Sequence, residues 1–385
     1  MNADALGDGR TIVALSTPPG RGALAVVRLS GRGVDAIAAR MLVPVPTAPR
    51  HATRCRVRGC DGSIIDDAIA VLYVAPHSFT GEDLLEITTH GGAIAPTAVL
   101  GAAVAAGARM AEPGEFTRRA VLNGKMDLLQ AEAIGDLIDA RSSAAHKVAL
   151  RQLDGGLSRR IEGLRAALLV LEAQLAYDID FPEEDDGPIS RDRILSTAQS
   201  VIARLDLLLS SGVQGALVHN GALVVLAGAP NVGKSSLFNA LLGEARAIVT
   251  DVPGTTRDAI ESVLDMPHWP LRLVDTAGLH DTENLVEQLG IEASSRYLRR
   301  ADVVLACVDG SNGFPIAEML RSHTDAPIII VRTKADLVAD RSHISADVFV
   351  SATSGEGLRS LLQVVEDRLS GLHGTPSMDA PLLTR

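Results

Sequence analysis

Residues Gly228–Ser235 read GAPNVGKS, and this stretch decides the fold of the second half of the 385-residue chain. It lies between the apolar run ALVVLAG and the segment SLFNALLG, which has the apolar spacing of a helix. A G-x-x-x-x-G-K-[ST] loop between a strand and a helix brings backbone N–H groups close to phosphate oxygens. We expect Lys234 to bridge the outer phosphates and Ser235 to offer its hydroxyl to Mg²⁺. The stretch therefore predicts a phosphate-binding loop in an α/β domain.

Two segments further along the chain extend this predicted phosphate site. DVPGTTRD at 251–258 supplies Thr256 as a second Mg²⁺ ligand. In DTAG at 275–278, Asp275 can hold a water of the metal shell, and Gly278 can offer its N–H to the γ-phosphate. The order of these segments is the order that a GTPase requires.

The segment TKAD at 333–336 predicts the choice of base. Asp336 can accept hydrogen bonds from the guanine N1–H and exocyclic amine, and the stem of Lys334 can pack along the base. Thr333 stands where the NKxD motif has Asn, so we expect weaker guanine binding with the specificity retained. SAT at 351–353 is predicted to place backbone N–H groups near the guanine O6. The predicted GTP-binding residues are Asn231, Val232, Gly233, Lys234, Ser235, Ser236, Thr250, Asp251, Val252, Pro253, Gly254, Thr255, Thr256, Asp275, Thr276, Ala277, Gly278, Thr333, Lys334, Asp336, Ser351, Ala352 and Thr353.

Leu279 directly follows DTAG, where Ras-type GTPases have a Gln that orients the attacking water. Leucine has no polar atom, so another group must align the water. Glu287 is a candidate, and the alternative for it is an exposed carboxylate at the start of a helix. The amide oxygen of Asn231 can coordinate a monovalent cation beside the phosphates, where an arginine finger would otherwise act, with further oxygens from the backbone of Thr250–Thr255. From these residues alone, both roles stay open.

The apolar pattern divides the chain into three regions. From Thr11 to about Gly124, short runs such as ALAVVRLSG and DLLEITTHGG, with one Ala-rich helical run, predict an α+β module. From about Gly221, apolar strands alternate with helical segments and predict a mainly parallel sheet covered by helices. We expect domains at residues 1–124, 125–215 and 216–372, with 373–385 beginning a further helical segment. The middle region is predicted to hold amphipathic helices because apolar residues recur at steps of three and four, on either side of the acidic loop DIDFPEEDDGPIS: Ile161, Leu164, Leu168, Leu171 and Leu175, then Ile194, Ala198, Val201, Leu205 and Leu208.

Charge and composition limit the functional classes. The net charge of -11 excludes a protein that coats nucleic acid by bulk electrostatics. A local basic cluster at Arg50, Arg54, Arg56 and Arg58 is read as a solvated loop or edge strand in preference to an RNA contact.

Cysteine use and apolar run length predict the compartment. The three cysteines, Cys55, Cys60 and Cys307, cannot form a disulfide framework, which is typical of reduced thiols in a cytoplasm. The N-terminus lacks a signal-like apolar core and no run approaches 18 apolar residues, so we predict a cytoplasmic protein without a membrane span.

Long segments outside the GTPase motifs carry a family resemblance. The chain resembles the tRNA uridine-5-carboxymethylaminomethyl modification GTPases, the MnmE or TrmE family. The matching segments include TIVALSTPPGRGALAVVRLSG, HSFTGEDLLEITTHGG, PGEFTRRAVLNGKMDLLQAEAIGDLIDA and GAPNVGKSSLFNALLGEARAIVTDVPGTTRD. The resemblance covers almost the whole sequence.

The resemblance implies a cofactor set and a fold. The N-terminal domain would bind a tetrahydrofolate, 5,10-methylene- or 5-formyl-tetrahydrofolate, and form a homodimer. A helical domain and a Ras-like G domain inserted into it would follow. Read locally, each folate residue is an ordinary surface or interdomain ion pair. By resemblance the folate site contains Arg28, Glu86 and Lys125; Mg²⁺ is held by Ser235 and Thr256; K⁺ is held by Asn231, Thr250, Val252 and Thr255; and Glu287 is catalytic.

The resemblance also implies a function and partners. The family hydrolyses GTP when its G domains dimerise in potassium. With an FAD-containing partner, in a heterotetramer, it modifies the wobble uridine at position 34 of certain tRNAs, and hydrolysis drives opening and closing of the G domains. Rival functions are a GTP-dependent switch in ribosome maturation and an inactive shortened form. The second arises because family members continue past LLTR with more helices and a Cys-containing tail, whereas this sequence ends at Arg385.

Overall fold

The computed structural model describes residues 9–180, 189–244, 247–248, 260–275, 296–310, 314–338, 340–341 and 343–375. These residues form two compact units, Met1–Ala131 and Glu132–Arg385, and each is described by itself.

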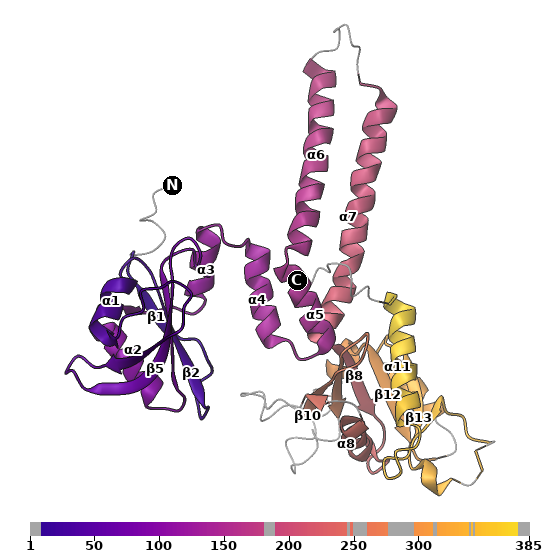
Figure 1. Ribbon diagram of the computed structural model, residues 1–385. Coiled ribbons are helices and arrows are strands. Elements are labelled where there is room, and N and C mark those ends of the chain that lie inside the picture. Colours follow the sequence, from indigo (N-terminus) through magenta and orange to yellow (C-terminus); the bar gives the residue numbers. More distant parts are fainter. Residues whose placement is uncertain are drawn as a thin grey trace. The chain divides into compact units, whose positions relative to one another are not determined.

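The first unit is a seven-stranded sheet with the strand order β3-β4-β5-β6-β2-β1-β7 (Figure 1). Neighbouring strands are antiparallel except β1 and β7, which are parallel. Helices α1 and α2 pack on one face over a core of Val, Leu, Ile and Ala side chains. This confirms the predicted α+β module. The elements are β1 (Ile12–Leu15), β2 (Leu24–Ser30), α1 (Val34–Met41), β3 (Leu42–Val43), β4 (Thr53–Arg58), β5 (Ile64–Tyr73), β6 (Leu84–His90), α2 (Ala95–Ala105), β7 (Arg109–Met110) and α3 (Glu115–Leu122).

The two predicted amphipathic helices are present in the second unit as α6 (Gly156–Asp180) and α7 (Arg191–Asn220). The structure adds two shorter helices before them, α4 (Leu128–Asp139), which begins just before this unit, and α5 (Ser143–Leu153). Helices α6 and α7 contact each other. Of the predicted apolar positions, Leu164 and Val201 are buried, whereas Ile161, Leu168, Leu175 and Leu205 are exposed. Of the predicted acidic loop, residues 178–180 end α6 and residues 181–188 lie outside the described residues.

One of these helices bears on the membrane prediction. By length and composition alone, α7 could cross a membrane, and 33% of its apolar window is buried inside the protein. Core helices of soluble proteins pass the same test. The last turn of α7 indeed contributes Leu217 and Val218 to a core shared with the following sheet.

The second sheet has the order β14-β13-β12-β8-β11-β10-β9. Strands β14, β13, β12, β8 and β11 are parallel, and β10 and β9 are antiparallel at one edge. Helices α8 and α11 cover one face, and residues 296–300 with α10 cover the other. The predicted mainly parallel sheet is therefore confirmed. The elements are β8 (Ala222–Ala227), α8 (Lys234–Glu244), β9 (Ala247–Ile248), β10 (Ile260–Leu264), β11 (Leu271–Asp275), β12 (Val303–Val308), α10 (Phe314–Arg321), β13 (Ile328–Arg332), a 3-10 turn η3 (Ala335–Leu337), β14 (Val348–Phe349) and α11 (Leu358–His373).

A continuous core joins α5 and α7 to the second sheet. Ala144 and Val148 of α5 are buried in one cluster with Trp269 and the strands. The Ser143 backbone N–H and hydroxyl both donate to the Asp265 carboxylate, at 2.9 and 2.6 Å. The Trp269 indole N–H donates to the Ser370 hydroxyl at 3.1 Å. The helices and the sheet are thus tied together by packing and by hydrogen bonds.

Candidate functional site

The predicted phosphate loop connects β8 to α8 and has a backbone shape that only a few residues permit. Asn231 and Gly233 have φ of 62° and 96°, in the left-handed region. Gly228 has φ of 152°, and a Cβ there would collide with the Cys307 carbonyl oxygen of the neighbouring strand. The first N–H groups of α8 have no partner within the helix, so the loop and helix start present donors to an anion. The geometry therefore fits the predicted phosphate site.

Lys234 lies at the centre of this loop. It is 7% exposed, and its Nζ donates to the carbonyl oxygens of Gly228 and Ala229 at 3.0 and 2.9 Å. The loop therefore folds around the ammonium group and holds it at the strand end. By contrast, Asn231 and Ser235 are exposed at the same loop, where their side-chain oxygens are accessible to ions.

The TKAD segment is tied directly to the phosphate loop. The Thr333 hydroxyl lies 2.5 Å from the Val232 carbonyl oxygen and 3.0 Å from that of Val308, and it can donate to either. Lys334 has φ of 53°, and its Nζ donates to the Asn231 carbonyl oxygen at 2.9 Å. Thr333 is buried, so it connects two loops, a role that the analysis of the sequence did not foresee.

Asp309 is a further site residue that the sequence analysis missed. Its Oδ2 lies 2.9 Å from Lys334 Nζ, and the hydrogen bond from Lys334 lowers the pKa of this carboxyl. Its position in the sequence could have indicated this role. Asp309 directly follows the last residue of β12, and the phosphate loop follows β8 at the same edge of the parallel sheet.

Asp336, the predicted guanine acceptor, is oriented by Ser351. The buried Ser351 hydroxyl donates to Asp336 Oδ1 at 2.6 Å. The backbone N–H of Ser351 donates to the Glu356 carbonyl oxygen at 3.0 Å. The Ser351 hydroxyl therefore holds the Asp336 carboxylate, and the predicted role of the N–H groups of residues 351–353 near a guanine stays a prediction.

Asp275 and Cys307 lie behind the phosphate loop at the ends of β11 and β12. Asp275 is 2% exposed. Burial raises the pKa of the Cys307 thiol to about 12, with a lowering influence from Lys234 and a raising one from Asp275. Lys234 and Asp275 are thus close to the Cys307 thiol. With this raised pKa the thiol stays neutral at pH 7 and acts as a small apolar side chain.

Several predicted site residues lie outside the described residues. They are Thr250, Asp251, Val252, Pro253, Gly254, Thr255, Thr256, Thr276, Ala277, Gly278 and Glu287.

In the first unit, the structure brings two of the three predicted folate residues together. Arg28 on β2 and Glu86 on β6 are opposite each other in register. Arg28 donates to Glu86 Oε1 at 2.7 and 3.0 Å, and its guanidinium lies over the Phe79 ring, 5.3 Å from the centroid. Lys125 makes a separate contact, from Nζ to the Pro76 carbonyl oxygen at 3.0 Å.

A buried ion-pair network fixes α3 beside this pair. Glu115, with its side chain 1% exposed, accepts from Arg109 at 2.6 and 2.8 Å and from Arg119 at 3.0 Å. The hydrogen bonds from Arg109 lead the interactions that lower the Glu115 pKa to about 2. Arg119 also pairs with Glu82 at 3.0 Å. The same helix carries Phe116, whose ring centroid is 5.9 Å from the Arg28 guanidinium carbon. By fixing α3, the ion pairs thus hold the Phe116 ring beside Arg28.

The basic cluster and the cysteines can be placed in the same way. Arg54, Arg56 and Arg58 belong to β4, which is one strand in from the sheet edge. Arg54 and Arg56 each lie 3.6 Å from the Asp67 carboxylate. All three cysteines are free thiols, and of these Cys60 is exposed.

Comparisons with known proteins agree across almost the whole chain. The family model described as the GTP-binding protein TrmE N-terminus matches residues 11–125, and the MnmE helical domain model matches residues 128–385. The tRNA modification GTPase MnmE of Azoarcus sp. (strain BH72) is 45% identical over 94% of this chain and 82% of the relative. The chain belongs to the MnmE family. The MnmE of Aquifex aeolicus (strain VF5) is 43% identical, over 92% of this chain and 81% of the relative.

Membership of the MnmE family makes the chain a GTPase of the tRNA modification class, consistent with the phosphate loop and the TKAD segment. A solved G domain, that of the T. maritima FeoB iron transporter, is 27% identical and covers 38% of this chain and 98% of that chain, with a TM-score of 0.29. At this TM-score the assignment rests on the MnmE-family sequences.

Proposed function

We propose that this MnmE-family GTPase binds GTP in the loop between β8 and α8 and uses its hydrolysis to support modification of the wobble uridine, position 34, of tRNA. The observation that carries the proposal is the arrangement of five side chains at one sheet edge. Lys234 lies at the centre of the phosphate loop. Thr333 and Lys334 hydrogen-bond the TKAD segment to that loop, and the Ser351 hydroxyl donates to Asp336. A carboxylate held in this way can accept from the guanine N1–H and from the exocyclic amine at C2, whereas adenine has no hydrogen on N1 and no amine at C2.

The ion chemistry follows from the exposed side chains of the loop. Ser235, together with Thr256, would hold Mg²⁺, which neutralises charge on the transferring phosphate. Asn231 would hold K⁺ with Thr250, Val252 and Thr255. The fit of Asn231 is supported by its exposed amide and its left-handed backbone beside the phosphate loop. Glu287 would align the attacking water, because Leu279 has no polar atom to do so.

The folate part of the proposal is supported by the Arg28–Glu86 pair. A guanidinium suits the anionic tail of a tetrahydrofolate, and a carboxylate or ammonium suits the pterin edge. Arg28 and Glu86 are about a quarter exposed, at 26% and 24%, so a ligand can reach them. Lys125 would supply a further hydrogen-bond donor to the folate. The folate that donates the one-carbon unit would be 5,10-methylene- or 5-formyl-tetrahydrofolate.

The assembly that we propose is a cytoplasmic homodimer that joins an FAD-containing protein in a heterotetramer and accepts tRNA. Folate supplies the one-carbon unit and the FAD-containing partner the redox chemistry for the 5-carboxymethylaminomethyl group. Hydrolysis of GTP changes the relative stability of open and closed G-domain pairs.

The cation assignment is tested by GTP hydrolysis in matched salts. We expect hydrolysis several-fold faster in KCl than in NaCl, because K⁺ replaces the charge of an arginine finger. Asn231→Ala should remove that difference. Asn239→Ala, which removes an exposed amide from α8, is the matched control and should keep it. Equal wild-type rates in the two salts would contradict the K⁺ assignment.

The role of Glu287 is tested by separating catalysis from binding. Glu287→Ala should lower kcat by about a hundredfold, within the range typical of a group that assists proton transfer or water alignment, while GTP affinity changes little. Glu283→Ala is a nearby control on sequence grounds. A parallel fall in kcat and GTP affinity would assign Glu287 a structural role.

A further inference from the structure

A sharp turn of the backbone at Lys334 links β13 to η3 in the candidate base site. Lys334 has φ of 53° and ψ of 43°, in the left-handed region, which is unfavourable for a residue with a Cβ. The turn lets Lys334 Nζ reach the Asn231 carbonyl oxygen and Asp309 Oδ2, each at 2.9 Å. It also leads directly into η3, which carries Asp336. An unfavourable backbone conformation persists only where the surrounding structure holds it, so neighbouring groups must fix this turn.

The Arg332 side chain contacts the peptide bond that precedes the turn. Its Nη1 donates to the Thr333 carbonyl oxygen at 2.8 Å. This carbonyl belongs to the planar peptide group that enters Lys334, so the hydrogen bond fixes the plane from which φ of Lys334 is set. The same Nη1 lies 3.4 Å from the carbonyl oxygen of Val308, the last residue of β12. One guanidinium therefore connects the end of β12 to the turn at Lys334.

Packing alone does not account for an arginine at position 332. Arg332 is 8% exposed, and its Nε is buried without a hydrogen-bond partner among the residues that the structure describes. A buried guanidinium with an unpaired N–H destabilises a fold, whereas an apolar side chain of similar length would fill the space without that penalty.

The carboxylate of Asp309 is a nearby counter-charge for Arg332. The hydrogen bond from Lys334 leads the influences that lower the pKa of Asp309, and the charge of Arg332 adds to them. Arg332 thus stabilises the ionised form of the carboxylate that holds Lys334 Nζ, in addition to fixing the peptide bond before Lys334.

We propose that Arg332 is a positioning residue of the nucleotide site and acts through Lys334. It fixes the peptide bond between Thr333 and Lys334, so that the Lys334 stem is in place to pack along the base before a nucleotide arrives. This role rests on the proposed binding of GTP at the loop between β8 and α8. Because the turn is already ordered in the free protein, the contribution of Arg332 is to GTP affinity and not to kcat.

The test compares GTP affinity and kcat of the full chain with those of Arg332→Met and Arg332→Lys. We expect Arg332→Met to bind GTP about tenfold more weakly with kcat within about twofold of wild type, because preorganisation is lost while the reacting groups are unchanged. Arg332→Lys keeps the charge and a donor, so its GTP affinity should lie within about threefold of wild type.

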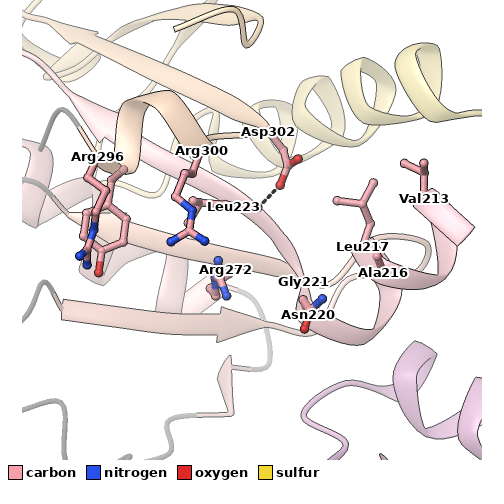
Figure 2. A pocket seen from close by; sticks show the side chains of 11 residues that line it. Val213, Ala216, Leu217, Asn220, Gly221, Leu223, Arg272, Arg296, Arg300 and Asp302 are labelled. Carbon is pink, nitrogen blue, oxygen red and sulfur yellow. Dashed lines mark hydrogen bonds between the residues drawn. The ribbon is translucent and has the colours of Figure 1, made fainter. Parts of the chain in front are cut away.

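The matched control removes an arginine away from the turn at Lys334. Arg300 lines a hollow of about 530 Å³ together with Arg272 and Arg296, at the starts of β8 and β11 (Figure 2). The phosphate loop follows the other end of β8. Arg300→Met therefore makes the same charge change in the same domain, and screening by salt should keep its GTP affinity within about twofold of wild type.

A double-mutant cycle separates a positioning role from a general loss of stability. In the Lys334→Met background, Arg332→Met should change GTP affinity by less than about twofold, because the group through which Arg332 acts is already gone. Arg332→Gln replaces Arg332→Met in both backgrounds if the latter does not fold. If wild type binds GTP and Arg332→Met binds it equally well, or if the two changes add in full, the positioning role is wrong and the proposed function stands. If wild type does not bind GTP, the proposed function fails and the role of Arg332 fails with it.

Discussion

The predicted nucleotide site and the predicted N-terminal folate site of this MnmE-family chain are built by different means. In the nucleotide site, eight consecutive residues, Gly228–Ser235, set the backbone, and neighbouring strand ends add side chains to it. In the N-terminal site, Arg28 and Glu86 meet only because β2 and β6 pair in one register, and α3 is fixed beside them by buried ion pairs. A contiguous loop needs little support to keep its shape, whereas a dispersed site depends on the packing of the whole sheet.

The largest expected effect is a loss of stability from Glu115→Gln, which tests how far the Arg28–Glu86 region depends on the packing around it. With Glu115 neutral, Arg109 and Arg119 lose their shared buried counter-ion. We expect the first unit to lose about 3 kcal/mol of its free energy of unfolding, because the Glu115 pKa is lowered from 4.5 to about 2 and each unit corresponds to about 1.4 kcal/mol. Chemical denaturation at pH 7 measures this difference, with Glu112→Gln as the control.

The pH dependence follows from the direction of the same shift. A lowered folded-state pKa means that the contribution is fully present above the unfolded value of about 4.5 and is lost as the pH falls toward 2. The difference between wild type and Glu115→Gln should therefore shrink between pH 4.5 and 2. The exposed Glu112, 3.6 Å from Arg118, should show little of this effect. A Glu115→Gln protein as stable as wild type at pH 7 would remove the contrast between the two sites.

A smaller effect is expected on folate binding from Arg28→Ala. Loss of the guanidinium should weaken tetrahydrofolate binding about tenfold, or about 1.4 kcal/mol, because one charge-assisted contact is removed. Arg54→Ala, on β4 of the same sheet and 82% exposed in its side chain, should leave the affinity unchanged. Isothermal titration at high protein concentration measures both. Equal affinities for wild type and Arg28→Ala would show that the pair is only structural and would favour a nucleotide-dependent switch without folate chemistry.

The smallest effect is expected from Thr333→Val, which tests how far the nucleotide site depends on contacts beyond its loop. The change removes the hydroxyl that lies 2.5 Å from the Val232 carbonyl oxygen while keeping the side-chain shape. We expect GTP affinity to fall about fivefold, since a net hydrogen bond contributes about 1 kcal/mol. Thr333→Ser keeps the hydroxyl and should bind as wild type does. An unchanged affinity in Thr333→Val would mean that the loop alone holds its shape.

The parts of the fold that could be predicted from the sequence are those with local causes. The apolar run ALVVLAG and the apolar strands expected after it became the buried parallel strands β8, β11, β12 and β13, and the residues spaced around Ile161 and Ile194 became α6 and α7. The partners of Thr333, Lys334 and Asp336 could not be predicted, because they come from loops that follow other strands. Asp309 was missed for the same reason.

The sequence by itself determined the phosphate loop, the class of nucleotide and the period of each helix and strand, because these depend on residues that are neighbours in the chain. Only the tertiary structure decided that Arg28 faces Glu86, that Ser351 orients Asp336, and that Arg272 shares a hollow with Arg300. The physical reason is that strand register and helix packing bring together side chains far apart in the sequence. Their charges act on one another only at the short distances that the folded chain creates.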